Sequence, residues 1–309
     1  MTLATPVAVA IFNRPDHTRR LVSALRSARP ATIFLIADGP RTPEEADACN
    51  RARALFEDLD WECTVHRDFS DANLGARKRI ATGLDRVFAE TEAAIILEDD
   101  CIPSPSFFPF CEALLSRYRD DERIMEVGGC NHQFGIRRTP CSYYFSRRIH
   151  TWGWATWRRA WRHFDADMAG WPEFKRRHGL RGFVSGPMEE SYWARMLDDV
   201  YEGRKTETWD YQWLFALWSR GGLSIVPEVN LVSNIGHGQG ATHTTDPAHV
   251  LANLPTGEIG ELVHPTVIEA NAEADLFEFH KAHGGDRWSS LPARIRRKAR
   301  DLQRLLAGR

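Results

Sequence analysis

Short apolar runs alternate with longer amphipathic segments over the first hundred residues of the chain. Each run has the length of a buried strand; the four runs occupy residues 7–12, 32–37, 61–66 and 93–97. Between them, one helix is predicted to begin around Pro15, and two more span residues 43–57 and 75–90. Alternating strands and helices predict an α/β fold with a mostly parallel central sheet that is flanked by helices.

After residue 130 the pattern becomes irregular. Helical spacing recurs near residues 156–163, 188–201 and 209–219, and a further strand is expected at 224–226. Nine of the eleven Trp lie between residues 152 and 218, and most of them are expected in the core, with sugar stacking as the alternative. Because no Pro- or Gly-rich linker separates the halves, we expect one compact unit made of residues 1–130 and 131–284.

Composition narrows the class of protein. The chain has 309 residues, of which 43% are hydrophobic and 27% are charged, as in an ordinary globular protein. The net charge of −2 gives no basic excess for nucleic acid. No signal peptide and no membrane-spanning run are visible, and the six Cys lack metal-type spacing. These features predict a cytoplasmic protein with reduced thiols.

Positive charge is concentrated at the C-terminus. Residues 286–309 contain seven Arg, one Lys and two Asp, a net charge of +6. Ile295, Ala299, Leu302 and Leu306 recur at helical spacing among these basic residues. Residues 285–309 are therefore expected to form a basic amphipathic helix. It would contact the inner face of a membrane as a peripheral element or dock on the acidic body of the protein.

Polar residues follow each predicted strand of the first half. Parallel strands bring their carboxyl ends to one rim of a sheet, where α/β proteins bind ligands. These residues could therefore converge on one ligand. They are Asn13 and Arg14, Asp38, residues 68–73, and Glu98 to Asp100.

The fourth strand ends in three consecutive acids, Glu98, Asp99 and Asp100, and Pro103 and Pro105 are expected to prevent further pairing. Three carboxylates at the end of a buried strand repel one another and lose solvation. A hard divalent cation with oxygen ligands would relieve both costs. A solvated acidic turn is the alternative.

In the order of their predicted strands and in the acidic triplet, residues 6–245 resemble glycosyltransferases of the GT-A fold, in particular bacterial relatives of family 2. In that fold an acidic triplet at the end of the fourth strand holds a divalent metal against the donor diphosphate. The second half resembles N-acetylglucosaminyltransferase I in four short motifs that occur in the same order: Gly153-Trp154, Trp209-Asp210, Pro227-Glu228 and Gly236-His237-Gly238-Gln239. This chain has Asp210-Tyr211 at the position where that enzyme has two consecutive Asp residues.

The resemblance implies a role for each matching residue. Asp100 would bind Mn²⁺ or Mg²⁺, and Asp210 would be the catalytic base. The residues expected to bind the nucleotide-sugar are Phe12, Arg14, Asp38, Asn73, Gly75, Arg79, Glu98, Asp99, Trp154 and His237.

Several of these residues also have a purely structural interpretation. Asp38 could simply occupy an Asp-Gly turn, and Arg77 to Arg79 could form a solvated basic face. Asp210 follows Thr208, a candidate N-cap, so the helix dipole alone would stabilise a carboxylate there. The loop at 234–246, with His237 and His243, is expected to close over the donor, or else it is an ordinary surface loop.

The predicted function is metal-dependent transfer of a sugar, with inversion, from a nucleoside-diphosphate sugar to a glycan or glycolipid-like acceptor. A UDP-sugar is the expected donor. Two alternatives are a non-catalytic nucleotide- or carbohydrate-binding module and a sugar-phosphate nucleotidyltransferase. The second class would carry a Gly-rich phosphate loop after the first strand, whereas this chain has Asn13, Arg14, Pro15 and Asp16 there.

Overall fold

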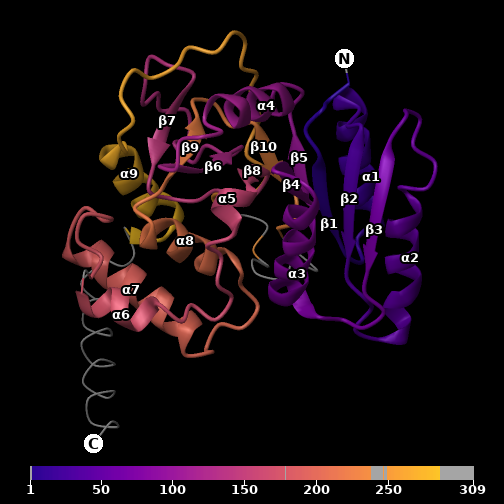
Figure 1. Cartoon of the computed structure of the whole chain (residues 1–309), viewed down its shortest axis with the longest axis horizontal. Helices are drawn as coiled ribbons and strands as arrows, with labels where there is room; N and C mark the ends of the chain where they lie inside the picture. The colour runs from indigo at the N-terminus through magenta and orange to yellow at the C-terminus, as the bar shows by residue number, and fades with distance from the viewer. Residues whose placement is uncertain (1, 178, 238–245, 247–248, 286–309) are drawn as a thin grey trace, which may run out of the picture.

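A computed structural model describes residues 2–177, 179–237, 246 and 249–285. Its centre is an eight-stranded sheet (Figure 1). In spatial order the strands are β3 (Thr64–Phe69), β2 (Thr32–Ala37), β1 (Val7–Ile11), β4 (Ala93–Glu98), β8 (Trp154–Trp157), β6 (Ile124–Gly128), β9 (Leu223–Pro227) and β7 (Tyr143–Ser146). Strands β3, β2, β1 and β4 are mutually parallel, as are β6 and β9, while β8 and β7 run antiparallel to their neighbours. The predicted α/β class with a mostly parallel sheet is confirmed.

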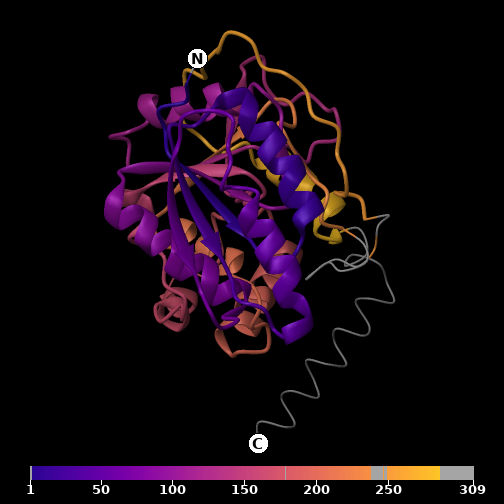
Figure 2. The ribbon, with the colours of Figure 1, turned by 90° about the vertical axis from the view of Figure 1, so that its right-hand side faces the viewer.

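Helices cover both faces of this sheet (Figure 2). One face packs against α1 (Pro15–Ala28), α2 (Ala46–Ala54) and α4 (Phe107–Arg117). The opposite face packs against α3 (Gly75–Glu90), α5 (Arg158–Trp161), α6 (Trp171–Arg177), α7 (Pro187–Tyr201) and α8 (Asp210–Ser219). The last described helix, α9 (Ala272–Ala282), packs near β7 and β9.

The central strands are apolar on both faces because both faces are covered. In β2, Ile33 and Leu35 belong to the core beneath α1 and α4, while Phe34 and Ile36 belong to the core beneath α3. Such continuous burial produces the unbroken apolar runs seen in the sequence. The core beneath α3 also contains seven of the Trp, which confirms that most of them are core residues: Trp154, Trp161, Trp171, Trp193, Trp209, Trp213 and Trp218.

A second, two-stranded sheet lies beside the end of β4. It pairs β5 (Cys101–Pro103) with β10 (Val232–Asn234) in antiparallel register, with Asn234 opposite Cys101. The prediction that Pro103 prevents further pairing was wrong, because Pro103 ends this short strand opposite Val232. This pairing carries residues 234–237 to the acidic segment at residues 98–100. Two segments that are more than a hundred residues apart thereby meet at one place.

Some predicted boundaries were wrong. The third strand begins at Thr64 and not at residue 61, and the segment 43–57 divides into a 3₁₀ turn, η1 (Pro43–Glu45), and α2. The segment 156–163, predicted to be helical, contains the end of β8 and then a single helical turn, α5. The predicted basic helix at 285–309 lies almost entirely outside the described residues, because only residue 285 is described.

The two predicted halves share the central sheet. Strand β8, from the second half of the chain, lies between β4 and β6 from the first half. Among the described helices, none has the length and apolar character needed to cross a lipid bilayer.

Candidate functional site

One cavity of about 1090 Å³ opens where β1, β2 and β4 end. This volume is slightly above the usual range of about 300–1,000 Å³ for ligand-binding clefts. Of the twelve residues predicted from the sequence, all but Trp154 line it: Phe12, Arg14, Asp38, Asn73, Gly75, Arg79, Glu98, Asp99, Asp100, Asp210 and His237. The parallel strands therefore bring the polar strand ends to one rim.

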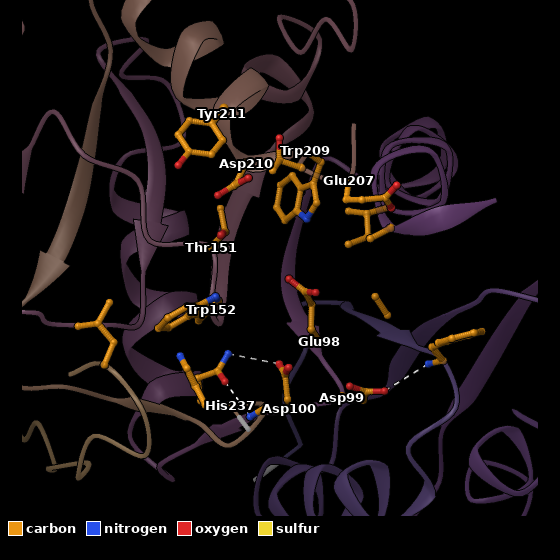
Figure 3. Close-up of a pocket in the computed structure, with 18 of the residues that line it drawn as sticks. Glu98, Asp99, Asp100, Thr151, Trp152, Glu207, Trp209, Asp210, Tyr211 and His237 are labelled. Carbon is orange, nitrogen blue, oxygen red and sulfur yellow. Dashed lines mark hydrogen bonds between the residues drawn. The ribbon is translucent and has the colours of Figure 1, made fainter. Parts of the chain in front are cut away.

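The acidic triplet lies in the middle of this cavity, with Glu98 between Asp100 and Asp210 (Figure 3). The Asp99 carboxylate is buried and accepts a hydrogen bond from the backbone N–H of Phe12 at 3.2 Å. Arg14 donates to Asp100 at 3.1 Å and lies 4.0 Å from Asp99. Arg14 is thus the cation of an ion pair with this triplet.

Burial and mutual repulsion destabilise the ionised carboxylates of Glu98 and Asp99. Burial, and then the neighbouring Asp100 carboxylate, raise the pKa of Asp99 to about 7. The same two causes, followed by Asp99 and Asp210, raise the pKa of Glu98 well above its usual range. Each shift means that the ionised form is destabilised, and a bound cation would reverse that effect.

Strand β10 brings Asn234 and His237 to Asp100. The backbone N–H of Ile235 donates to the Asp100 carbonyl at 2.9 Å, and the Asn234 amide donates to its carboxylate at 3.4 Å. The His237 ring lies edge-on to Trp152 and stacked on His249, with centroids 5.3 and 5.4 Å away. Burial, and then His249, lower the pKa of His237, which favours a neutral imidazole with a free lone pair.

The expected closing loop falls mostly outside the described residues. Residues 234–237 and 246 are described, whereas 238–245, including His243, are not. The closing role of this loop stays a prediction.

Asp38 organises the start of α3. Its carboxylate accepts from the backbone N–H groups of Gly39, Leu74 and Gly75 and from the Asn73 amide, at 2.9 to 3.1 Å. Four donors occupy the four lone-pair positions of a carboxylate. Asp38 therefore holds Asn73 and Gly75 in the cavity wall, and the geometry favours this positioning role over direct acceptance from a nucleotide.

The basic residues at the start of α3 are mostly bonded within the protein. Arg79 is buried, donates to the carbonyls of Ala37 and Asp68 at 3.2 and 2.5 Å, and pairs with the Asp68 carboxylate at 2.7 Å. Arg77 and Lys78 line a neighbouring cavity and not the one that contains the triplet. Arg79 thus fixes the ends of β2 and β3 beneath the cavity.

Asp210 lies in the first turn of α8, as predicted, but the predicted cap was wrong. Trp209 occupies the N-cap position, and the Thr208 hydroxyl is buried without a hydrogen-bond partner among the described residues. Figure 3 shows Asp210 beside Thr151 and Tyr211, across the cavity from Asp100. A carboxylate at a helix N-terminus is favoured by the helix dipole.

Trp154, the predicted aromatic of the site, does not line the cavity. It is fully buried in the core, stacked on Trp209 with ring centroids 5.7 Å apart. Gly153 precedes it with a φ of +73°, and this turn sends Trp152 to the cavity and Trp154 to the core. Trp152 and Trp209 are therefore the tryptophans in the cavity wall.

The far end of the cavity is lined by Tyr192, Tyr211 and Lys205, together with the end of α9 and the residues after it. Lys205 lies over the Tyr211 ring at 5.5 Å. Aromatic side chains with a few polar groups are typical of the lining of small-molecule pockets. These residues were not predicted from the sequence, because only the tertiary packing of α7 to α9 brings them together.

Comparisons with known proteins assign no role to any residue of this chain. No protein-family model matches the chain, and no curated protein matches it. Similar solved structures include UDP-glucose pyrophosphorylase complexed with UDP-glucose, with 8% identity, a TM-score of 0.29, and 52% of this chain and 79% of that chain covered. Another is 4-diphosphocytidyl-2C-methyl-D-erythritol synthase from Anaerococcus prevotii, with 8% identity, a TM-score of 0.33, and 66% and 86% covered. At these values the likeness supports no argument about the site.

Proposed function

We propose that this protein is a metal-dependent, inverting glycosyltransferase of the GT-A type, using a nucleoside-diphosphate sugar as donor. A UDP-sugar is the expected donor, and a hydroxyl of a glycan or glycolipid-like molecule is the expected acceptor. One observation carries the proposal: the carboxylates that end β4 and the carboxylate of Asp210 on α8 line the same cavity.

The donor side has the chemistry required to hold a diphosphate. Glu98, Asp99 and Asp100 are three adjacent acids, with Arg14 as the cation that pairs with them. This oxygen-rich set fits Mn²⁺ or Mg²⁺, and Asp100, which is less buried than Asp99, is the proposed direct ligand. When bound, the ion would offset the charge that develops on the departing diphosphate.

Asp210 is the proposed base on the acceptor side. Its carboxylate would take the proton of the acceptor hydroxyl while the hydroxyl oxygen bonds to the anomeric carbon and the bond from that carbon to the diphosphate breaks. Attack from the face opposite the leaving group inverts the configuration. Trp152, Trp209 and Thr151 line the space between Asp210 and the triplet and could orient the transferred sugar.

We also propose that the two halves of the chain, which share the central sheet, bind different substrates. Residues 1–130 would bind the nucleotide-sugar, and residues 131–284 would supply the acceptor surface. The segment at 234–246 would close over the bound donor, with His237 facing the diphosphate.

The nucleotidyltransferase alternative makes a different product. It would join a nucleoside triphosphate to a sugar phosphate and release pyrophosphate, and its phosphates would need a loop after β1. Here only Phe12, Asn13 and Arg14 separate β1 from α1, which begins at Pro15. This short connection favours sugar transfer.

The test is turnover of a panel of nucleotide-sugars, with and without Mn²⁺, monitored as release of nucleoside diphosphate. We expect metal-dependent release by the wild type, loss of release in Asp100→Ala, and normal release in Asp47→Asn, a control with an exposed carboxylate on α2. A thermal-shift panel of the same ligands identifies the base and sugar, because a ligand of the native state raises the melting temperature. Equal turnover in wild type and Asp100→Ala would contradict the proposal.

A further inference from the structure

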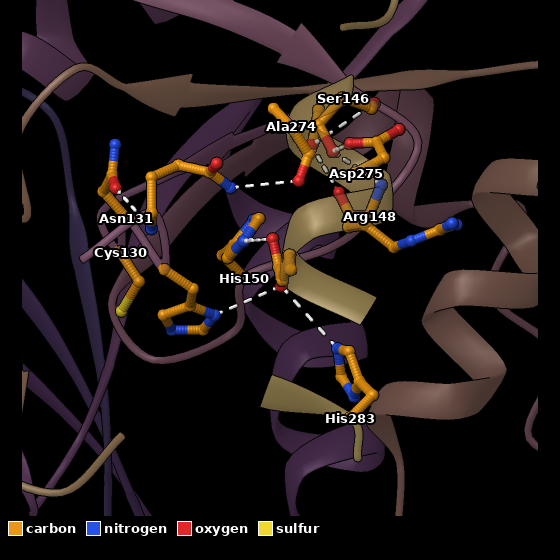
Figure 4. Close-up of polar contacts among 12 residues, drawn as sticks. Cys130, Asn131, Ser146, Arg148, His150, Ala274, Asp275 and His283 are labelled. Atoms are coloured by element: carbon orange, nitrogen blue, oxygen red, sulfur yellow. Dashed lines mark hydrogen bonds and ion pairs between the residues drawn. The ribbon is translucent and has the colours of Figure 1, made fainter. Parts of the chain in front are cut away.

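A second group of potential metal ligands lies behind the cavity wall, separate from the acidic triplet. His132 follows β6, His150 precedes β8, and Glu278 is on α9; all three side chains are buried. The Glu278 carboxylate is 3.1 Å from His132 Nδ1 and 3.0 Å from His150 Nε2 (Figure 4). The three donor atoms lie within 4.8 Å of one another.

A fourth donor stands next to these three. His283, just after α9, places Nε2 3.7 Å from the Glu278 carboxylate (Figure 4). His283 also lines the large cavity, so the cluster has a side that a solvent-borne ion can reach. Three imidazoles and one carboxylate form a complete four-ligand set for zinc.

The spacing of these donors suits a tetrahedral ion. Ligand atoms that lie about 2.0–2.2 Å from zinc are about 3.3–3.6 Å from each other in a tetrahedron. The imidazole separations from the two carboxylate oxygens of Glu278, at 3.1 and 3.7 Å from Oε1 and 3.0 Å from Oε2, bracket that value. The donor atoms of His132, His150 and Glu278 lie within 4.8 Å of one another, so side-chain rotations that shift a donor atom by about 1 Å would bring them to tetrahedral spacing.

The surroundings of the cluster are rich in buried acids. Besides Glu278, the buried carboxylates here are Asp275, one turn earlier on α9, and Glu126, which accepts from the His150 backbone N–H at 2.7 Å. Among the described residues of this region, the buried arginine is Arg148, and its guanidinium is paired with a further buried carboxylate, Glu189. Asp275 accepts hydrogen bonds from Ser146 and the Arg147 N–H, and Glu126 accepts one from Trp213. A dication would add positive charge to this acidic region and so stabilise it further.

We propose that His132, His150, Glu278 and His283 form a structural zinc site, distinct from the proposed Mn²⁺ or Mg²⁺ site at Asp100. Imidazole ligands favour a borderline transition metal, whereas the all-oxygen triplet favours a hard cation. The zinc would tie the segments after β6 and before β8 to the end of α9. That end lines the far part of the cavity, and Trp152, also in the cavity wall, packs against His132 with ring centroids 5.9 Å apart.

The test is the metal content of the full-length chain, purified with any histidine tag removed, stripped with a chelator and reconstituted with zinc. We expect about one zinc per chain by mass spectrometry and a higher melting temperature on zinc addition. Glu278→Gln and His150→Gln should lose the bound zinc. The control His66→Gln alters a partly exposed histidine on β3 that faces Glu90 at 3.6 Å and should keep it.

Asp100→Ala separates this site from the proposed function, because that variant should keep its zinc whether or not it transfers sugar. If Glu278→Gln and His150→Gln fail to fold, the proposal is tested on the wild type alone, by measuring its zinc content and its competition for zinc with a coloured chelator. A wild type that retains no zinc after reconstitution would overturn the proposal and leave a hydrogen-bonded network. Zinc that is lost in Asp100→Ala but kept in Glu278→Gln would overturn it too.

Discussion

The substitution Gly236→Ala would place a methyl group against the proposed metal ligand. A Cβ at Gly236 would be 1.9 Å from Oδ2, 2.6 Å from Cγ and 2.9 Å from Cβ of Asp100. Rotation of the carboxylate relieves the first two contacts, but the third requires a movement of the segment after β10. Gly236 does not have a left-handed φ, so the effect is steric and the backbone itself tolerates alanine.

The expected loss is one of affinity for the nucleotide. Overpacking of this kind costs about 1–3 kcal/mol. If the Asp100 carboxylate turns away to avoid the methyl group, that energy appears as weaker metal-dependent binding, about 5- to 150-fold, since each 1.4 kcal/mol is tenfold. The melting temperature without ligand should also fall, because the contact with Asp100 Cβ remains after the carboxylate has rotated and the segment after β10 must move.

Calorimetric titration of UDP in the presence of Mn²⁺ measures this loss. The matched control is Gly260→Ala, where a Cβ meets no atom within 4 Å. An affinity of Gly236→Ala within twofold of the wild type would refute the reasoning, because it would mean that Asp100 does not need its present position to bind the ion and diphosphate.

Four further substitutions test other parts of the site. Asp210→Asn should lower sugar transfer by about 10²-fold or more while donor affinity is unchanged, and near-normal transfer would place the base elsewhere. Trp154→Ala should lower the free energy of unfolding by about 3–5 kcal/mol in urea titrations, whereas Trp152→Ala should cost less stability and alter transfer; equal stability losses would contradict their different placement. Asp38→Ala leaves the amides of residues 74 and 75 unpaired and should weaken nucleotide binding through disorder at the start of α3, seen as faster hydrogen exchange there; unchanged exchange would remove this positioning role.

The first half of the fold was predictable because each of its elements carries a local signal. Strand β2 and helix α3 begin and end where the sequence pattern placed them, at Thr32–Ala37 and Gly75–Glu90. Strand β3 begins three residues later than predicted, because it lies at the edge of the sheet and its residues are only partly buried, so its sequence pattern is weak. Its register is fixed by pairing with β2, in which Thr64 lies opposite Thr32, and the apolar run around Trp61 does not reveal that pairing.

The second half depended on long-range contacts that periodicity does not encode. Antiparallel insertion of β8 between β4 and β6, and pairing of β10 with β5, decide which residues reach the triplet. Asn234 is an example: it was recognised only as the start of a loop, yet it contacts Asp100. Trp154 is the converse case, because a short sequence motif cannot show that the turn at Gly153 sends it into the core.

The most direct test of the central claim is NMR of a single reaction containing the protein, Mn²⁺, the nucleotide-sugar selected by thermal shift and an acceptor. The account predicts that the phosphorus spectrum shows nucleoside diphosphate as the released product. The proton spectrum should show the sugar on the acceptor with the anomeric configuration opposite to that of the donor. Pyrophosphate formed from a nucleoside triphosphate and a sugar phosphate, or a product with retained configuration, would contradict it.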